Sequence, residues 1–246
     1  MPSNVYGYVP SRAMVVVAHP DDAEFMVAGT VAKWTQAGSE VTYVIITKGD
    51  KGSDDPEMTP ERLTEIREAE QRAAGAVLGV KHFEFMGYED GYLQPTLELR
   101  RDLARLIRKY RPEVLVTFDP TNRIYSDTYV NHPDHRAAGD AAMDAVFPTA
   151  RDRLTFPELL AEGFEPWKVR QLWLAHPTEA NTWVDVAETI ELRRQALRAH
   201  PSQLDETTIE FAIQMCQWAG AQAELPYAEA FRRITLEEEP QPAKVE

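Results

Sequence analysis

Two short segments carry histidine and aspartate side chains at spacings that suit metal binding. The first is His19-Pro20-Asp21-Asp22, and the second is His132-Pro133-Asp134-His135. Each lies downstream of an apolar run, residues 13–17 and 114–118, that predicts a buried strand. Because open α/β sheets bind ligands beyond the carboxyl ends of their strands, we expect both segments to contribute to one site.

Zinc is the ion that this set of donors predicts. It binds imidazole nitrogen and carboxylate oxygen, and a catalytic zinc site has three protein ligands and an open position for water. His19 and Asp22 would supply two ligands, and the second segment would supply the third. Asp21 would remain free as the general base of a hydrolase. The alternative is a pair of surface turns set by proline, but two such segments after two predicted strands favour the metal site.

The two segments resemble those of the LmbE-like (PIG-L-like) family of zinc-dependent N-deacetylases, which act mainly on N-acetylglucosamine-containing compounds. The resemblance covers most of the chain and includes residues 47–52, 67–70, 87–93 and 199–203. It implies removal of an acetyl group from an N-acetylated sugar or sugar conjugate. The expected cofactor is Zn²⁺, although Fe²⁺ or Co²⁺ could occupy the same ligands.

The resemblance also implies roles for individual residues. His19, Asp22 and His135 would bind the metal, and Asp21 would be the base. His132 would face the reacting carbonyl without binding the metal.

Three further residues have both an ordinary and a functional interpretation. Arg67 would ordinarily be a solvated helix charge, and Asp90 would form a turn; by resemblance both contact the substrate. Asp134 is either a carboxylate in the first turn of a helix or the partner that holds His132 in one tautomer.

Tyr125, Tyr129 and His176 lie near the predicted site without an assigned role. Members of the family often carry a tyrosine close before the second segment, and the nearest one here is Tyr129. Residues 119–131 predict a long loop without periodicity, of the kind that is often functional. Whether it acts as a lid stays open.

The charge and cysteine content of the chain indicate which binding partners and which compartment to expect. The formal net charge of −14 argues against nucleic acids and anionic membranes as partners, whereas a small neutral sugar is compatible with it. A single cysteine, Cys216, allows no internal disulfide, and the chain shows no targeting segment, so we expect a cytoplasmic enzyme. A homo-oligomer is compatible with the sequence.

The order of predicted elements indicates an α/β fold. Strands are expected at 13–17, 41–46, 81–85 and 114–118, with helices at 26–37, 60–78 and 96–110 between them. Such alternation predicts a Rossmann-like, mostly parallel sheet with helices on both faces. We expect the switch point between the first and fourth strands.

The second half of the chain predicts more strands and helices of the same domain. A helix is expected at about 133–146, an irregular segment at 151–167, strands at 169–175 and 182–186, and helices at 187–199 and about 207–233. We therefore expect one domain over 1–236. It would have a catalytic core at about 12–150, an appendage at 151–236, and a disordered acidic tail at 237–246.

Three rival functions remain. One is an amidase that acts on a larger sugar or thiol conjugate, and the width of the crevice would distinguish it. Another is a nucleotide-binding oxidoreductase, which is disfavoured because no Gly-x-Gly-x-x-Gly follows the first strand. The third is a metal-binding protein without catalysis, which the presence of Asp21 disfavours.

Overall fold

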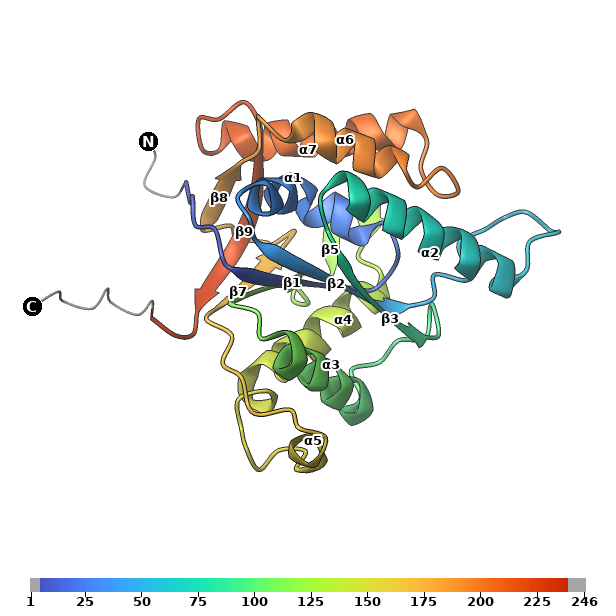
Figure 1. Cartoon of the computed structure of the whole chain (residues 1–246). Coiled ribbons are helices and arrows are strands. Elements are labelled where there is room, and N and C mark those ends of the chain that lie inside the picture. The colour runs from blue at the N-terminus through green and yellow to red at the C-terminus, as the bar shows by residue number, and fades with distance from the viewer. Residues whose placement is uncertain (1–4, 239–246) are drawn as a thin grey trace, which may run out of the picture.

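A seven-stranded sheet organises the computed structural model, which describes residues 5–238 (Figure 1). The strand order is β3-β2-β1-β4-β7-β9-β8. Neighbours among the first five strands are parallel, and β9 is antiparallel to both β7 and β8. The predicted α/β fold with a mostly parallel sheet is therefore confirmed. The tail predicted at 237–246 lies, from residue 239 onward, outside the described residues.

The first half of the chain forms the expected βαβ units. Its elements are β1 (Arg12–Val17), α1 (Asp22–Gln36), β2 (Glu40–Thr47), α2 (Pro60–Val77), β3 (His82–Tyr88), α3 (Leu97–Tyr110) and β4 (Val114–Phe118). The central strands are apolar runs because both of their faces are covered by helices. Thr59 and Thr96 cap α2 and α3 through their side chains, so local sequence determines where these helices begin.

The chain reverses its winding direction between β1 and β4, as predicted. β1 pairs with β2 on one side and β4 on the other, whereas α3 carries the chain from the edge strand β3 back to β4. The loops after β1 and β4 therefore open onto the same edge of the sheet.

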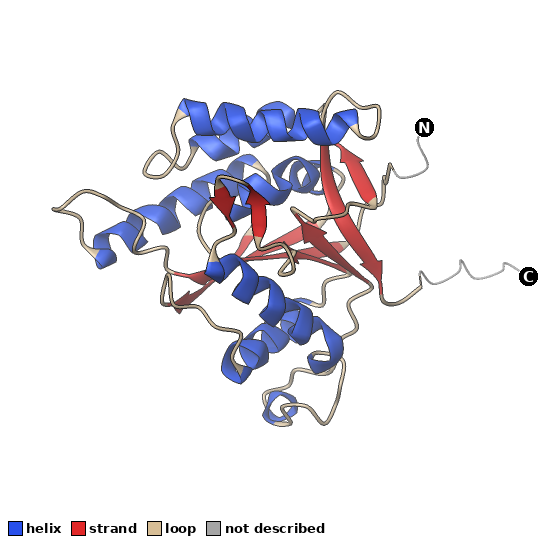
Figure 2. Cartoon of the chain, turned by 180° about the vertical axis from the view of Figure 1, so that it is seen from behind, coloured by secondary structure: helices blue, strands red, loops and turns tan. Residues whose placement is uncertain are grey.

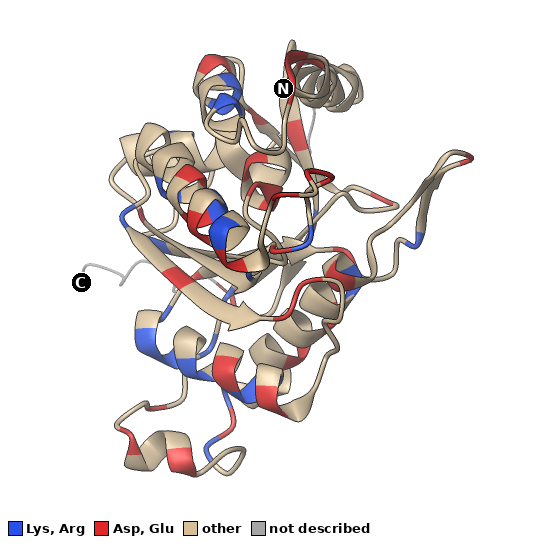
Figure 3. Cartoon of the chain, turned by 90° about the vertical axis from the view of Figure 1, so that its right-hand side faces the viewer, with Lys and Arg blue, Asp and Glu red and all other residues tan. Residues whose placement is uncertain are grey.

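Helices cover both faces of the sheet (Figures 1 and 2). Helices α1, α2, α6 (Ile190–Arg198) and α7 (Glu206–Ala221) lie on one face, and α3, α4 (Pro133–Asp144) and the short α5 (Glu158–Ala161) lie on the other. Figure 3 turns toward the viewer the end of the molecule that carries the loop between β2 and α2; acidic residues are numerous there. Within residues 5–238 no helix is both long and apolar enough to cross a membrane.

The predicted helix at about 207–233 is wrong in its second half. Helix α7 ends at Ala221, and Ala228–Thr235 forms β9, which fills the slot between β7 (Gln171–Ala175) and β8 (Thr182–Asp185). Pairing on both edges provides hydrogen bonds that an isolated segment of this composition lacks. The strands predicted as an appendage thus extend the same sheet.

Residues 119–131 are not a structureless loop. They contain a two-stranded hairpin of β5 (Ile124–Ser126) and β6 (Tyr129–Val130), which is separate from the main sheet. These strands are too short to give a periodic pattern. Helix α4 begins at Pro133 as expected and is followed by η1 (Ala145–Thr149), where Phe147, with φ −141° and ψ 117°, breaks the helical backbone.

Candidate active site

The segment between β1 and α1 places two carboxylates and an imidazole in a tight turn. Asp22 Oδ2 accepts a hydrogen bond of 2.7 Å from the backbone N–H of His19 and lies 3.4 Å from His19 Nδ1. The other carboxylate oxygen, Oδ1, lies 3.1 Å from His135 Nε2. Asp22 therefore bridges the two segments that sequence reasoning expected to meet.

Three imidazole rings converge above the switch point. The ring centroids of His19, His132 and His135 lie 4.9–5.3 Å apart. Phe118, the last residue of β4, stacks on His135 with ring centroids 4.2 Å apart. The Nδ1 atom of His132 accepts a hydrogen bond of 3.2 Å from the N–H of Asp134 and so caps α4.

The donor set suits a divalent transition metal. His19, His132 and His135 each offer a nitrogen, and the three atoms lie within 4.8 Å of one another. Asp22 adds a carboxylate in contact with two of these rings. Imidazole and carboxylate donors at such separations are what zinc and its neighbours in the transition series prefer.

Two more carboxylates hold the far nitrogen of His19. Asp90 Oδ1 lies 3.1 Å and Asp134 Oδ2 lies 3.3 Å from His19 Nε2, and both side chains are buried. Such carboxylates orient a ligand histidine and leave its other nitrogen free to bind. His19 Nδ1, which faces Asp22, is then the nitrogen available to a metal.

Asp134 lies in the first turn of α4, as one of its two interpretations predicted, but it does not hold His132 as the other predicted. Its carboxylate contacts His19 instead of His132, because the side chain turns toward the loop after β3. There it accepts hydrogen bonds from Gly91 N at 2.7 Å and Leu93 N at 3.2 Å. Asp90 belongs to the same loop and accepts a hydrogen bond from Lys51 N at 3.1 Å.

Charges in this cluster shift the pKa values of its members. Burial raises the pKa of Asp21 to about 6; the Arg67 guanidinium opposes this rise and Asp22 adds to it. Burial would also raise the pKa of Asp22, but His135 and His19 hold it well below its usual range. For His132, burial and the two neighbouring histidines lower the pKa, so that its ring is neutral at pH 7.

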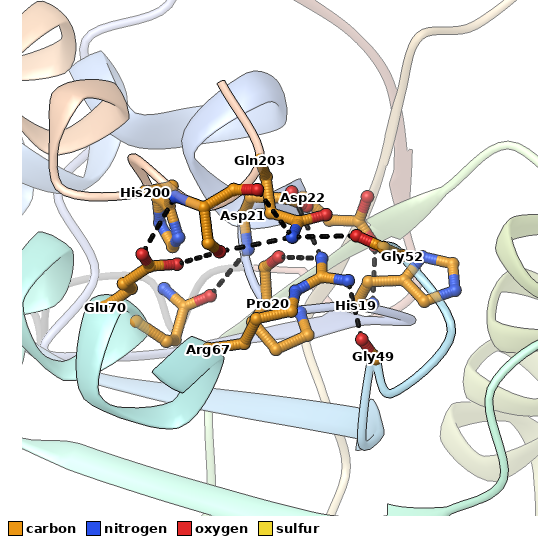
Figure 4. Close-up of polar contacts among 12 residues, drawn as sticks. His19, Pro20, Asp21, Asp22, Gly49, Gly52, Arg67, Glu70, His200 and Gln203 are labelled. Carbon is orange, nitrogen blue, oxygen red and sulfur yellow. Dashed lines mark hydrogen bonds and ion pairs between the residues drawn. The ribbon is translucent and has the colours of Figure 1, made fainter. Parts of the chain in front are cut away.

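Arg67 lies beside the turn, and its two terminal nitrogens donate to protein atoms (Figure 4). The guanidinium donates to Gly49 O at 2.9 Å, Pro20 O at 2.6 Å and Asp21 Oδ2 at 3.2 Å. Gly49 has φ +64°, and a Cβ there would lie 2.8 Å from the guanidinium carbon, so only glycine fits. The expected contact of Arg67 with substrate stays a prediction.

The hairpin of β5 and β6 contributes two tyrosines, one of which contacts His176. Tyr125 and Tyr129 stack with ring centroids 5.7 Å apart, and Tyr125 meets His176 edge-on at 6.2 Å. Burial and then the negative charge of Asp22 raise the pKa of Tyr129.

Sequence reasoning missed a buried polar pair behind the site, Glu24 and Gln71. Both side chains are fully buried, and Gln71 binds the backbone of Asp21. The signal that could have revealed Glu24 is an acid directly before the apolar run at residues 25–28 of α1, a helix on which buried positions predominate.

Comparisons with known proteins agree with this geometry. The chain is 29% identical to the diacetylchitobiose deacetylase of Thermococcus kodakarensis, over 91% of this chain and 83% of the relative. It is 32% identical to a probable N-acetyl-alpha-D-glucosaminyl L-malate deacetylase 2 of Bacillus anthracis, over 78% and 81%. The solved N,N'-diacetylchitobiose deacetylase of Pyrococcus horikoshii superposes with a TM-score of 0.85 at 28% identity, over 92% and 84%.

The family comparison covers both histidine segments. The profile described as GlcNAc-PI de-N-acetylase (PIG-L) matches residues 14–146, more than half of the chain, and this range contains His19 and His135. The segments that the structure brings together at the switch point are thus part of the match, and the chain belongs to the PIG-L (GlcNAc-PI de-N-acetylase) family.

Proposed function

We propose that this protein is a metal-dependent N-deacetylase that hydrolyses the acetamide of an N-acetylglucosamine-type sugar or sugar conjugate. Family membership and relatives named as deacetylases of such compounds support the reaction class. The observation that carries the proposal for this chain is the contact of Asp22 with both His19 and His135, with the carboxylate of Asp21 next to it in the same turn and within reach of the charges of Asp22 and His19.

We assign His19, Asp22 and His135 as the residues that would hold the ion, with Zn²⁺ as the proposed metal. The contact of Asp22 with both rings supports this choice over one that includes His132. A bound divalent ion would lower the pKa of a coordinated water and polarise the acetamide carbonyl.

Asp21 is the proposed general base. It takes a proton from the attacking water, whose oxygen forms the bond to the amide carbonyl carbon. The C–N bond then breaks, and Asp21 passes the proton to the departing nitrogen, so that acetate and a free amine are released.

His132 is proposed to stabilise the developing oxyanion. Its Nδ1 accepts the N–H of Asp134, which assigns the remaining ring proton to Nε2. A neutral imidazole in this tautomer can donate from Nε2 to the carbonyl oxygen as negative charge develops there.

Contacts of Arg67 and Asp90 with the sugar are a separate part of the proposal. Both side chains are buried and already bind protein atoms, so a structural contribution competes with a contact to the sugar. In Asp90→Ala, a sugar contact would raise KM for an N-acetylglucosamine substrate far more than KM for a small non-sugar amide. An equal effect on both substrates at matched metal content would end the sugar-contact interpretation.

Amine release from a panel of substrates tests the function. The panel contains N-acetylglucosamine, N,N'-diacetylchitobiose, an N-acetylglucosaminyl conjugate and a bulky N-acyl sugar, each assayed with a defined metal and with Asp21→Asn as the inactive control. We expect turnover of acetylated sugars that the metal-free protein lacks. Exclusive cleavage of the bulky acyl group would favour the rival amidase, and no amine release from any member would overturn the proposal.

Localisation and assembly also stay proposals. The single cysteine is compatible with a reducing cytoplasm, which we propose as the compartment. Size-exclusion chromatography with light scattering would determine whether the enzyme is a homo-oligomer.

A further inference from the structure

Asp21 has a backbone conformation that is unusual for a residue with a side chain. Its φ of 108° and ψ of −29° are left-handed, and its side chain does not cap α1. Such conformations cost energy and persist only where the surroundings hold them. Besides the backbone hydrogen bonds that its carbonyl accepts in α1, two contacts from α2 hold Asp21: its N–H donates to Gln71 Oε1 at 2.9 Å, and its carboxylate accepts from Arg67 Nη2 at 3.2 Å (Figure 4).

Glu24 determines which end of the Gln71 amide faces Asp21. The amide nitrogen of Gln71 donates to the two carboxylate oxygens of Glu24 at 3.0 and 3.1 Å. A carboxylate only accepts, so the nitrogen must face Glu24 and the oxygen must face Asp21. Because Glu24 and Gln71 are fully buried, water cannot replace either partner.

His200 contacts the same carboxylate of Glu24. Its Nε2 lies 3.2 Å from Glu24 Oε2, and the ring is fully buried. The turn that carries His200 is anchored to α2, since the N–H and hydroxyl of Ser202 donate to Glu70 at 3.0 and 2.6 Å. Gln203 Nε2 also donates to Gly52 O at 3.1 Å (Figure 4).

We propose that Glu24, held by His200 and acting through Gln71, is a positioning residue for Asp21. The inference rests on the proposed function, in which the carboxylate of Asp21 is the base. Glu24 does not touch the reacting atoms; its carboxylate keeps an acceptor under the Asp21 N–H and so maintains the left-handed turn that aims the base. Arg67 holds Asp21 as well, through the hydrogen bond to its carboxylate.

The substitution Glu24→Gln separates this role from simple packing. The new amide has nearly the same shape but can donate to Gln71 Oε1, which turns the Gln71 amide so that its nitrogen meets the Asp21 N–H. Two donors then face each other, and Asp21 leaves its aligned position. Misplacement of a reacting group by about 1 Å can cost about 10²-fold in rate. We expect kcat to fall by this order while KM and metal content stay near those of the parent enzyme.

Exchanging Glu24 and Gln71 with each other should restore the activity that Glu24→Gln loses. In Glu24→Gln/Gln71→Glu, the carboxylate at position 71 accepts both the Asp21 N–H and the amide of position 24, whose oxygen accepts from His200. We expect this double variant to recover most of the lost kcat. Glu65→Gln is the matched control, since it removes one exposed carboxylate from α2 without touching the network.

A second variant and crystal structures test the positioning role without relying on a single substitution or on the activity assay alone. Gln71→Met removes the acceptor of Asp21 but keeps the contact between Glu24 and His200, and it should lower kcat as Glu24→Gln does. Crystal structures of both single variants should show Asp21 out of its left-handed conformation. If both keep the parent kcat, or lower only thermal stability while Asp21 stays in place, the positioning role is refuted. An inactive parent enzyme would instead refute the proposed function.

Discussion

Asp134→Asn tests whether the carboxylates behind His19 support metal binding. In the parent, Asp134 Oδ2 accepts from Gly91 N at 2.7 Å and contacts His19 Nε2 at 3.3 Å, while Oδ1 accepts from Leu93 N at 3.2 Å. An amide has only one oxygen. If that oxygen keeps Gly91 and His19, the amide nitrogen faces the Leu93 N–H, and a buried donor loses its acceptor.

The expected magnitudes follow from this count of contacts. One buried, unsatisfied N–H costs about 1–3 kcal/mol of unfolding free energy. Loss of the negative charge behind a ligand histidine weakens metal binding by about 10–100-fold. Asp90, which remains on His19 Nε2, should keep the affinity loss within this range instead of abolishing binding.

Metal titration by competition with a chromogenic chelator measures the loss of metal affinity, and chemical denaturation of the metal-free protein measures the loss of unfolding free energy. Asp140→Asn is the matched control, because Asp140 is an exposed carboxylate on the same helix. Unchanged metal affinity together with unchanged stability in Asp134→Asn would refute the assignment of Asp134 as a support for His19.

Three further predictions concern the metal, the base and pH. His135→Ala should lose its metal by elemental analysis, whereas His132→Ala should retain it and turn over slowly; the opposite pattern would reverse their assignments. Asp21→Asn should keep full metal content and lose about 10²–10⁴-fold in kcat, as expected for a general base, so near-parent turnover would remove it from the mechanism. Burial disfavours charged His200, but its contact with Glu24 raises its pKa above 6.5 in the folded protein. This contribution to stability is therefore full below the unfolded pKa and is lost as pH rises through the folded value. Denaturation curves should show His200→Gln more destabilising at acidic than at alkaline pH, and a pH-independent difference would contradict this.

The first half of the fold was predictable because its signals are local. An apolar run such as residues 13–17 is a strand with two covered faces, and Thr59 before Pro60 is a helix start that depends only on neighbouring residues. The switch point followed from the order of these elements. The composition of residues 228–235 carried no comparable signal, because β9 obtains its partners from β7 and β8, far away in the chain.

For the candidate site, the sequence predicted which two segments come together but not all of their contacts. The two His-Pro-Asp segments do meet, since each follows a parallel strand at the same edge of the sheet. One of the two interpretations of Asp134 paired it with His132, its neighbour in sequence, yet its carboxylate reaches His19 across the site.

The amino-acid sequence by itself determined the chemistry available to this protein: imidazoles, carboxylates and the strands that bring them to one edge. Residue types and short-range spacing are sufficient for that, because strand ends and helix caps depend on a few adjacent residues. Only the tertiary structure decided that Asp90 and Asp134 share His19, and that Glu24 orients Gln71 beneath Asp21. These contacts join residues more than 40 positions apart, and their geometry depends on how the helices pack on the sheet.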